Sequence, residues 1–216
     1  MRENQLTRYG AITKVLPDVN PQAKVFFVGS TASDFFGDFV YTFTPDNDGV
    51  ARTHSTITAA LANCVAGRGD IIYVLPGYTQ DITGAAAIAV ATAGVMIIGL
   101  GTGRARPTLT WKTSTAAQIT ITAANTSFEN FIFDLTGISA VVAAFSVTAA
   151  DVSFLNNEFI ISTGTNAPVL GILTAATAAR LKVEGNRFIG PATSTDTVTA
   201  CIQHEVGIDY VIRNNE

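Results

Sequence analysis

The stretch Ser153–Phe159, SFLNNEF, places two adjacent asparagines between phenylalanines, although asparagine is depleted in β-strands and favours turns. A similar stretch returns downstream as Val183–Phe188, VEGNRF, and again as Val211–Glu216, VIRNNE. Asparagine therefore recurs at one place in a repeated unit. Such a repeat indicates a chain built from stacked copies of one structural element.

The repeated unit continues upstream of these asparagines as pairs of apolar alternations, each of which is typical of a strand with one buried face. The units are Ile88 and Val90 with Val95 and Ile97, Ile119 and Ile121 with Thr126 and Phe128, Phe145 and Val147 with Val152 and Phe154, Ile172 with Val183, and Ile202 and His204 with Asp209 and Val211. Their period is about 30 residues, with no helical segment between the strands. The pattern predicts an all-β fold, a parallel β-solenoid of about five to six coils.

Stacked coils place equivalent residues in columns along the solenoid axis. Asn157, Asn186 and Asn214 each lie three positions after their anchors at 154, 183 and 211, and are predicted to form a structural ladder of stacked side-chain amides. Phe159 and Phe188 lie five positions after the first two anchors and are predicted to stack in a parallel apolar column. These columns have a structural role and no catalytic one.

The N-terminal part of the chain predicts a different organisation. Residues 1–22 are mostly polar and contain Pro17 and Pro21, which predicts an extended arm that becomes ordered on a partner. Residues 23–69 are predicted to form a capping region with a short amphipathic helix at about 56–66, and residues 70–216 the β-helix itself. The last coil has no predicted cap, so we expect something else to cover its unpaired edge.

A group of residues at the start of the solenoid carries a family resemblance. These residues are Gly69, Asp70, Tyr73, Val74, Pro76, Gly77 and Tyr78. With the preceding helix, they resemble the opening coil of the right-handed parallel β-helix proteins of the pectate lyase-like superfamily. The resemblance implies a right-handed β-helix over about residues 25–216. That family includes lyases, hydrolases, virus tailspikes and proteins without enzymatic activity, so it does not define a function.

Acidic side chains do not gather on successive coils as a polysaccharide lyase or glycosidase would require. Glu158 and Arg187 both lie four positions after their anchors and are predicted to form an ion pair on adjacent coils. With Asp134 they form a fallback carbohydrate surface, on which Trp111 is a candidate for stacking against a sugar. The alternative without a functional role is that the charged residues are ordinary surface groups and that the tryptophan packs in the core.

The composition of the chain further limits the classes of molecule that it is expected to bind. The formal net charge is -4 and the 13 Lys and Arg residues form no basic stripe, which disfavours nucleic-acid binding. Two cysteines and two histidines lack metal-ligand spacing, so neither a metal nor a cofactor is expected. The uncharged stretch between residues 82 and 103 approaches the length of a membrane span, but its alternation matches the strand repeat, so no membrane partner is expected.

A short capped β-helix with an N-terminal arm and no cluster of catalytic residues resembles bacteriophage virion proteins that decorate or cement the head. The resemblance implies a non-enzymatic capsid decoration protein, made in the host cytoplasm and located on the virion. The expected partners are two further copies in a homotrimer and the major capsid protein or other virion subunits. The alternative is a tailspike-like or pectate lyase-like protein that binds or depolymerises a polysaccharide. A secreted adhesin ranks last, since no signal segment is evident at the N-terminus.

Overall fold

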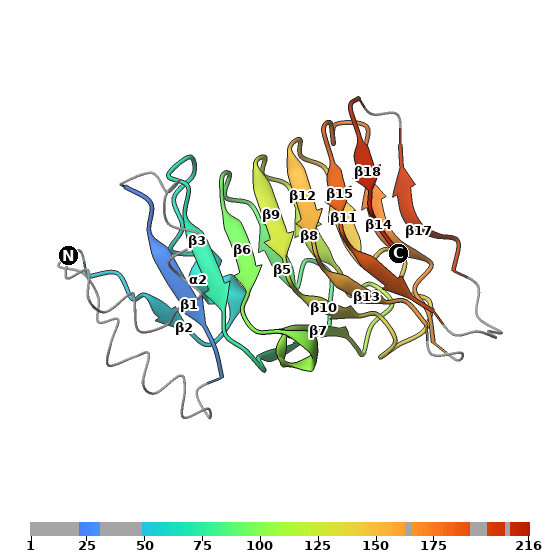
Figure 1. The fold of residues 1–216 in the computed structure, drawn as a ribbon, viewed down its shortest axis with the longest axis horizontal. Helices are drawn as coiled ribbons and strands as arrows, with labels where there is room; N and C mark the ends of the chain where they lie inside the picture. Colours follow the sequence, from blue (N-terminus) through green and yellow to red (C-terminus); the bar gives the residue numbers. More distant parts are fainter. Residues whose placement is uncertain (1–21, 31–48, 163–165, 191–197, 206–207) are drawn as a thin grey trace.

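The computed structural model describes residues 22–30, 49–162, 166–190, 198–205 and 208–216. Within these residues the chain is an all-β, parallel solenoid of about five turns, with its strands arranged in three sheets along one axis (Figure 1). Every strand pair in the three sheets is parallel. The predicted all-β solenoid is confirmed.

The first sheet lies across the front of the solenoid in Figure 1 and contains eight strands among the described residues. In spatial order they are β18 (Val211–Arg213), β15 (Lys182–Glu184), β12 (Val152–Leu155), β9 (Thr126–Glu129), β6 (Met96–Gly99), β3 (Ile71–Val74), β1 (Val25–Val28) and β2 (Thr53–His54). The strands β1 and β2 fall in the region predicted as a cap and extend this sheet. The predicted arm, except for its last residue, lies outside the described residues.

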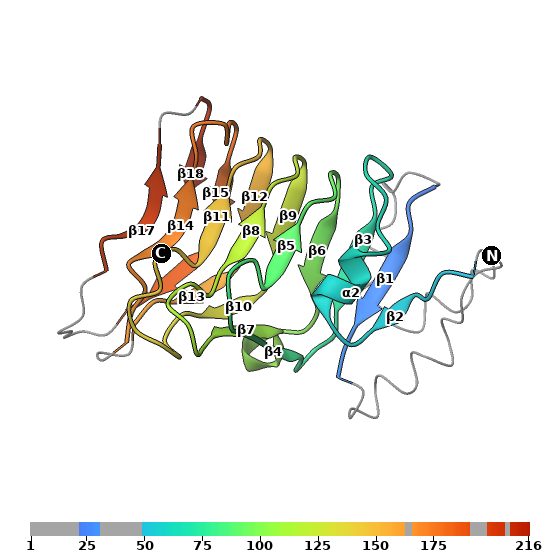
Figure 2. The same cartoon turned by 180° about the vertical axis from the view of Figure 1, so that it is seen from behind.

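The second and third sheets complete each coil (Figures 1 and 2). The second sheet contains β16 (Arg187–Ile189), β13 (Glu158–Ile160), β10 (Ile132–Asp134), β7 (Thr108–Trp111) and β4 (Thr79–Ile82). The third sheet contains β17 (Ala200–His204), β14 (Leu170–Thr174), β11 (Phe145–Val147), β8 (Ile119–Ile121) and β5 (Ile88–Val90). The repeated pairs of apolar alternations predicted the strands of the first and third sheets. The second sheet was not predicted as strands, and the sequence analysis identified only its phenylalanine column and some of its charged residues.

The helix α2 (Ile57–Leu61) is shorter than the predicted helix at about 56–66. The side chain of Thr56 accepts a hydrogen bond from the Ala59 N–H and so caps the helix start. After Leu61 the chain forms turns. There Asn63 Nδ2 donates back to the Ala59 carbonyl of α2, and Arg68 binds the Asn63 carbonyl and the Asp70 carboxylate. Ile57, Ala60 and Leu61 are buried against the first coils, so α2 packs on the hydrophobic core.

The core is a continuous apolar column filled by aromatic rings. Phe128 and Phe154 stack with their ring centroids 6.1 Å apart on adjacent strands of the first sheet. Phe133 and Phe145 approach edge to face from the other two sheets with their centroids 4.9 Å apart. Each ring removes a large apolar surface from water, and edge-to-face and offset contacts are favourable arrangements for aromatic pairs. The aromatic residues therefore join the three sheets at the centre of the solenoid.

Candidate functional site

In the later coils the corner between the first and second sheets is only two residues long and nearly identical from coil to coil. It consists of Asn156 and Asn157 between β12 and β13, and of Gly185 and Asn186 between β15 and β16. The first residue of each pair has a left-handed backbone, with φ of 54° at Asn156 and 67° at Gly185. Glycine and asparagine tolerate this conformation better than other residues, which explains why they occupy the position.

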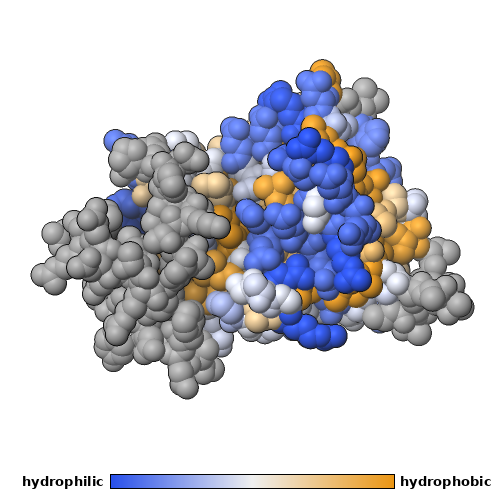
Figure 3. Space-filling model, viewed as in Figure 1, coloured by the Kyte–Doolittle hydropathy of each residue, from blue (hydrophilic) through white to orange (hydrophobic). Residues whose placement is uncertain are grey.

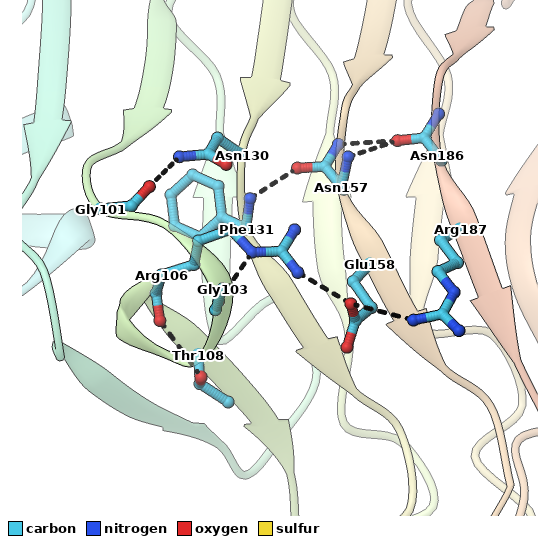
Figure 4. A network of polar contacts seen from close by, with 10 residues as sticks. All are labelled: Gly101, Gly103, Arg106, Thr108, Asn130, Phe131, Asn157, Glu158, Asn186 and Arg187. Atoms are coloured by element: carbon cyan, nitrogen blue, oxygen red, sulfur yellow. Dashed lines mark hydrogen bonds and ion pairs between the residues drawn. The ribbon is translucent and has the colours of Figure 1, made fainter.

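The second residue of each corner forms an asparagine ladder, made of Asn157, Asn186 and Asn215 (Figure 4 shows the first two). The Asn186 Oδ1 accepts the backbone N–H of Asn157 at 2.9 Å and its Nδ2–H at 3.1 Å. Asn215 Oδ1 accepts the same two groups of Asn186 at the same distances. The remaining amide protons bind the preceding coil, as in the bond from Asn186 Nδ2 to the Phe154 carbonyl at 2.9 Å.

The prediction that Asn214 belongs to the ladder is wrong. Val183 pairs with Ile212 and not with Val211, so the last coil is displaced by one residue from the predicted register. Asn214 therefore takes the left-handed position, with φ of 54°, and Asn215 takes the ladder position. The physical reason is that the left-handed residue must come first, because it turns the chain so that the next side chain points along the axis.

The phenylalanine column lies beside the ladder in the second sheet. Phe159 and Phe188 are paired on adjacent strands, and their rings stack 4.8 Å apart with an interplanar angle of 13°. Phe133 extends the column on the other side of Phe159, with a centroid distance of 4.9 Å. The ladder and the column thus fix the same corner in two ways, by hydrogen bonds and by apolar contact.

Glu158 lies on the outward face of the second sheet between two arginines (Figure 4). Its Oε2 is 2.8 Å from Arg106 Nη2 and 4.0 Å from Arg187 Nη1. The predicted pair with Arg187 is therefore the longer contact, and Arg106, which the sequence did not point to, is the closer partner. Arg106 follows the short 3₁₀ helix η3 (Gly103–Ala105) and donates from Nε to the Gly103 carbonyl, which holds the guanidinium towards Glu158. The Glu158 carboxylate is therefore engaged from two other coils.

The other two members of the proposed carbohydrate surface do not join Glu158. Asp134 lies on the same outward face, but its Oδ1 accepts hydrogen bonds from the backbone N–H and the hydroxyl of Thr136, two residues further on. Trp111 is 0% exposed, and its ring packs 5.3 Å from that of Phe145 in the core. The suggestion that Trp111 stacks on a sugar is wrong, because Trp111 occupies an inward-facing position of β7, one coil before Phe133 and Phe145 of the core.

Other charged groups also join one coil to the next. Arg180 makes a two-pronged contact with Asp151, at 2.6 Å to each carboxylate oxygen, and these hydrogen bonds hold the pKa of Asp151 below its ordinary value. Glu184 accepts from Lys182 and from Arg213, and those bonds lower the pKa of Glu184. Both carboxylates are ionised near neutral pH and serve as acceptors between coils.

Asp70 is the most completely satisfied acid among the described residues and lies where the capping region meets the first coil. It is 0% exposed and accepts from the Lys24 and Val65 backbone N–H groups at 2.8 Å each, and from two nitrogens of Arg68 at 2.6 and 2.7 Å. Burial opposes ionisation of Asp70, but the Arg68 and backbone hydrogen bonds outweigh it and lower the pKa. Asp70 therefore fastens β1 and the turn after α2 to the start of β3.

The two thiols have no catalytic environment. Cys64, in the turn after α2, and Cys201, in β17, are both free. Burial raises the pKa of Cys64 to about 12 and also raises that of Cys201, so both remain protonated thiols at neutral pH. Within the described ranges, no group of three or more His, Cys, Asp or Glu side chains is placed to hold a metal ion. In the same part of the chain, no helix has the length and apolar character needed to cross a membrane.

Of the two residues that the sequence analysis missed, Asn215 left a trace in the sequence and Arg106 did not. Asn214–Asn215 could have been aligned correctly by matching Gly185 with the left-handed residue of the other corners, since glycine marks that position. Arg106 left no comparable signal, because its partner Glu158 is 52 residues away and two coils further along.

The chain was compared with family models, with curated proteins and with solved structures. None of these comparisons found a match. The arrangement described above, in which polar side chains at equivalent positions bind one coil to the next, is therefore the basis for assigning a function.

Proposed function

We propose that this protein is a non-enzymatic structural protein that acts by assembly. One observation supports the proposal best: the polar groups that would be candidates for chemistry are used to hold adjacent coils together. Asn157 and Asn186 are buried in the ladder, and Glu158 is engaged by Arg106. A side chain that is fixed in this way stiffens the solenoid and has little freedom to bind or transform a substrate.

In its specific form, the proposal is a bacteriophage capsid decoration protein that binds the virion as a homotrimer and contacts the major capsid protein. The physical support is the shape and composition of the molecule. A stiff solenoid offers long, nearly flat faces, and only 14% of the residues are charged, so less charge opposes packing against a neighbour. Several such contacts made at once by a trimer increase the total affinity without any single tight site.

The outward face of the first sheet shows how these surfaces differ along the axis. Over β9, β12 and β15 it is hydrophilic (Figure 3), and Ser127, Glu129, Ser153, Lys182 and Glu184 lie there on alternate strand positions. Towards β3 and β6 the same face is apolar, with Ile71 and Tyr73 buried and Met96 and Ile98 partly buried. Only the hydrophilic half is therefore a face in contact with solvent, because Ile71 and Tyr73 in the apolar half are already buried in the single chain.

The first test is the mass of the intact protein in solution, measured by light scattering over a range of concentrations. We expect an assembly of at least three times the 22.6 kDa mass of one chain, followed by saturable binding to capsids that lack the protein. A protein that remains a monomer and does not bind capsids would contradict the proposal. In that case, loss of viscosity of a capsular or pectic polysaccharide would favour the polysaccharide-binding or depolymerising alternative.

A further inference from the structure

The outward face of the third sheet carries no charged side chain over four successive coils, those of β5, β8, β11 and β14 (Figure 2). In β5, β8 and β11 the outward residues alternate with buried apolar ones. The outward positions form two columns along the axis: Ala89, Thr120, Ser146 and Leu173 within the strands, and Ala91, Thr122, Thr148 and Ala175 directly after them. All eight residues are at least partly exposed, and we call this surface the third-sheet face.

The other two sheets carry charges on their outward faces. On the second sheet these include Asp134 and also Glu158, which binds Arg106. On the first sheet the later coils carry Lys182 and Glu184, which bind each other. The earlier coils of the first sheet are apolar on the outside, but the residues at the centre of that surface are already buried in the single chain. Among the described sheets, the third therefore presents the accessible face without charge.

Hydroxyl groups make up much of the third-sheet face. Thr120, Thr122 and Ser146 make no side-chain hydrogen bond to the rest of the described chain, and Thr148 donates to the Ile121 carbonyl at 3.4 Å. A hydroxyl both donates and accepts, so it can form a hydrogen bond with a copy of itself. A carboxylate only accepts and an ammonium group only donates, so neither can pair with its own copy. The third-sheet face is therefore chemically self-complementary.

Two larger apolar side chains accompany the hydroxyls. Leu173 belongs to the first column and is partly exposed. Val142 is 60% exposed and lies in the connection that leads into β11, where its N–H donates to the Thr115 carbonyl of the preceding coil. Covering both side chains would remove apolar area from water in addition to forming the hydroxyl contacts. A partner that packs on this face thus gains from burial as well as from hydrogen bonds.

We propose that the third-sheet face turns towards a three-fold axis parallel to the solenoid and packs against the same face of two further copies of this chain. The inference rests on the proposed homotrimer and names the surface that forms it. Because equivalent coils then lie at the same height, each residue next to the axis meets its own copies. Thr120 and Ser146 would meet hydroxyls, and no like charges would be brought together.

The second sheet is a less favourable surface for the same contact. A three-fold axis beside it would place Glu158 and Asp134 next to their own copies at equal height, and like charges that face each other oppose association. Glu158 would also have to keep its bond to Arg106 while that pair lost contact with water, which adds a desolvation cost. The third-sheet face carries neither cost.

The test is Ser146→Glu in the full chain, which places three like charges around the proposed axis. The matched control is Ser153→Glu, because Ser153 is also a partly exposed serine at an outward strand position, but on the first sheet. Ser146→Ala removes the hydroxyl without adding a charge. Thr122→Glu tests the same face at a more exposed position, where a glutamate is easily accommodated in the folded single chain. Circular dichroism checks that each variant is folded, and sedimentation over a range of concentrations gives the masses.

We expect the wild type, Ser153→Glu and Ser146→Ala to form the trimer. For Ser146→Glu and Thr122→Glu, the concentration at which half of the trimer has dissociated should rise at least about tenfold. If the folded glutamate variants of the third-sheet face associate like the wild type, or if Ser153→Glu weakens the trimer equally, the inference is overturned while the proposed homotrimer stands. A wild type that is monomeric at all concentrations would overturn both.

Discussion

Replacing Asn186 by leucine removes the central member of the asparagine ladder and should destabilise the fold substantially. The side chain is 1% exposed and takes part in four hydrogen bonds, two accepted by Oδ1 and two donated by Nδ2. Leucine is similar in size but cannot accept or donate. The groups that now form hydrogen bonds with Asn186 would remain buried, and no water molecule would replace the lost partner.

The magnitude follows from counting those groups. The backbone N–H of Asn157 has Asn186 Oδ1 as its partner, and the Phe154 carbonyl loses the bond from Nδ2. The other two bonds end on Asn157 Nδ2 and Asn215 Oδ1, and each of these atoms keeps a second partner. Two buried backbone groups thus lose a hydrogen bond, at about 1–3 kcal/mol each, so we expect a loss of about 2–6 kcal/mol.

The measurement is equilibrium unfolding in urea, followed by circular dichroism, with the slope against urea compared between variants. The control is Asn156→Gly, which removes a neighbouring amide that makes one side-chain hydrogen bond to the described residues, at 3.5 Å to Glu129, and keeps a left-handed position that glycine accepts. It should change the free energy of unfolding by less than about 0.5 kcal/mol. If Asn186→Leu costs no more than the control, the ladder does not stabilise the solenoid and the reasoning is refuted.

Two further predictions concern the cap and the coil spacing. The pKa of Asp70 is lower when folded than when unfolded, so its contribution to stability is present above the unfolded value of about 4 and is lost as the pH falls through the folded pKa. Asp70→Asn should therefore be less stable at neutral pH and should show a flatter fall in unfolding free energy in acid; an unchanged acid profile would exclude Asp70 as its source. Gly171→Ala should cost about 1–3 kcal/mol, since the added Cβ would lie 2.5 Å from the Cys201 carbonyl oxygen in the next coil. Gly190→Ala, where the same atom meets nothing within 4 Å, is the control, and equal effects at both positions on the urea midpoint would rule out close coil packing as the cause.

The sequence predicted the solenoid because apolar alternation repeats on each coil. Phe128, Phe154 and Val183 were placed in register, and the structure pairs them on adjacent strands. The last coil was placed one residue out because Val211 and Ile212 are both apolar, so alternation alone cannot distinguish the inward residue from the outward one. Only backbone conformation separates them.

The candidate carbohydrate surface was less predictable, because it depends on which side chains meet across coils of unequal length. Trp111 could have been placed in the core, since Leu109 and Trp111 alternate with threonines in β7 and both face inward. The contact between Arg106 and Glu158 could not be predicted, because strand β10 lies between β7 and β13 and the bond depends on the reach of a long side chain held by η3. Local pattern therefore determines the coil, while contacts between distant coils require coordinates.

In protein engineering, the corner between the first and second sheets is the part of the coil that should be left unchanged. Because the left-handed residue and the ladder asparagine set the phase of the later coils, length differences between those coils must be absorbed at the other corners, such as the connection from Asp134 in β10 to Phe145 in β11. A peptide grafted into that connection would lengthen one loop and leave the hydrogen-bonded register of the neighbouring coils unchanged. The solenoid is therefore a scaffold on which inserted epitopes can be displayed at intervals set by the coil spacing, about 4.8 Å for each coil.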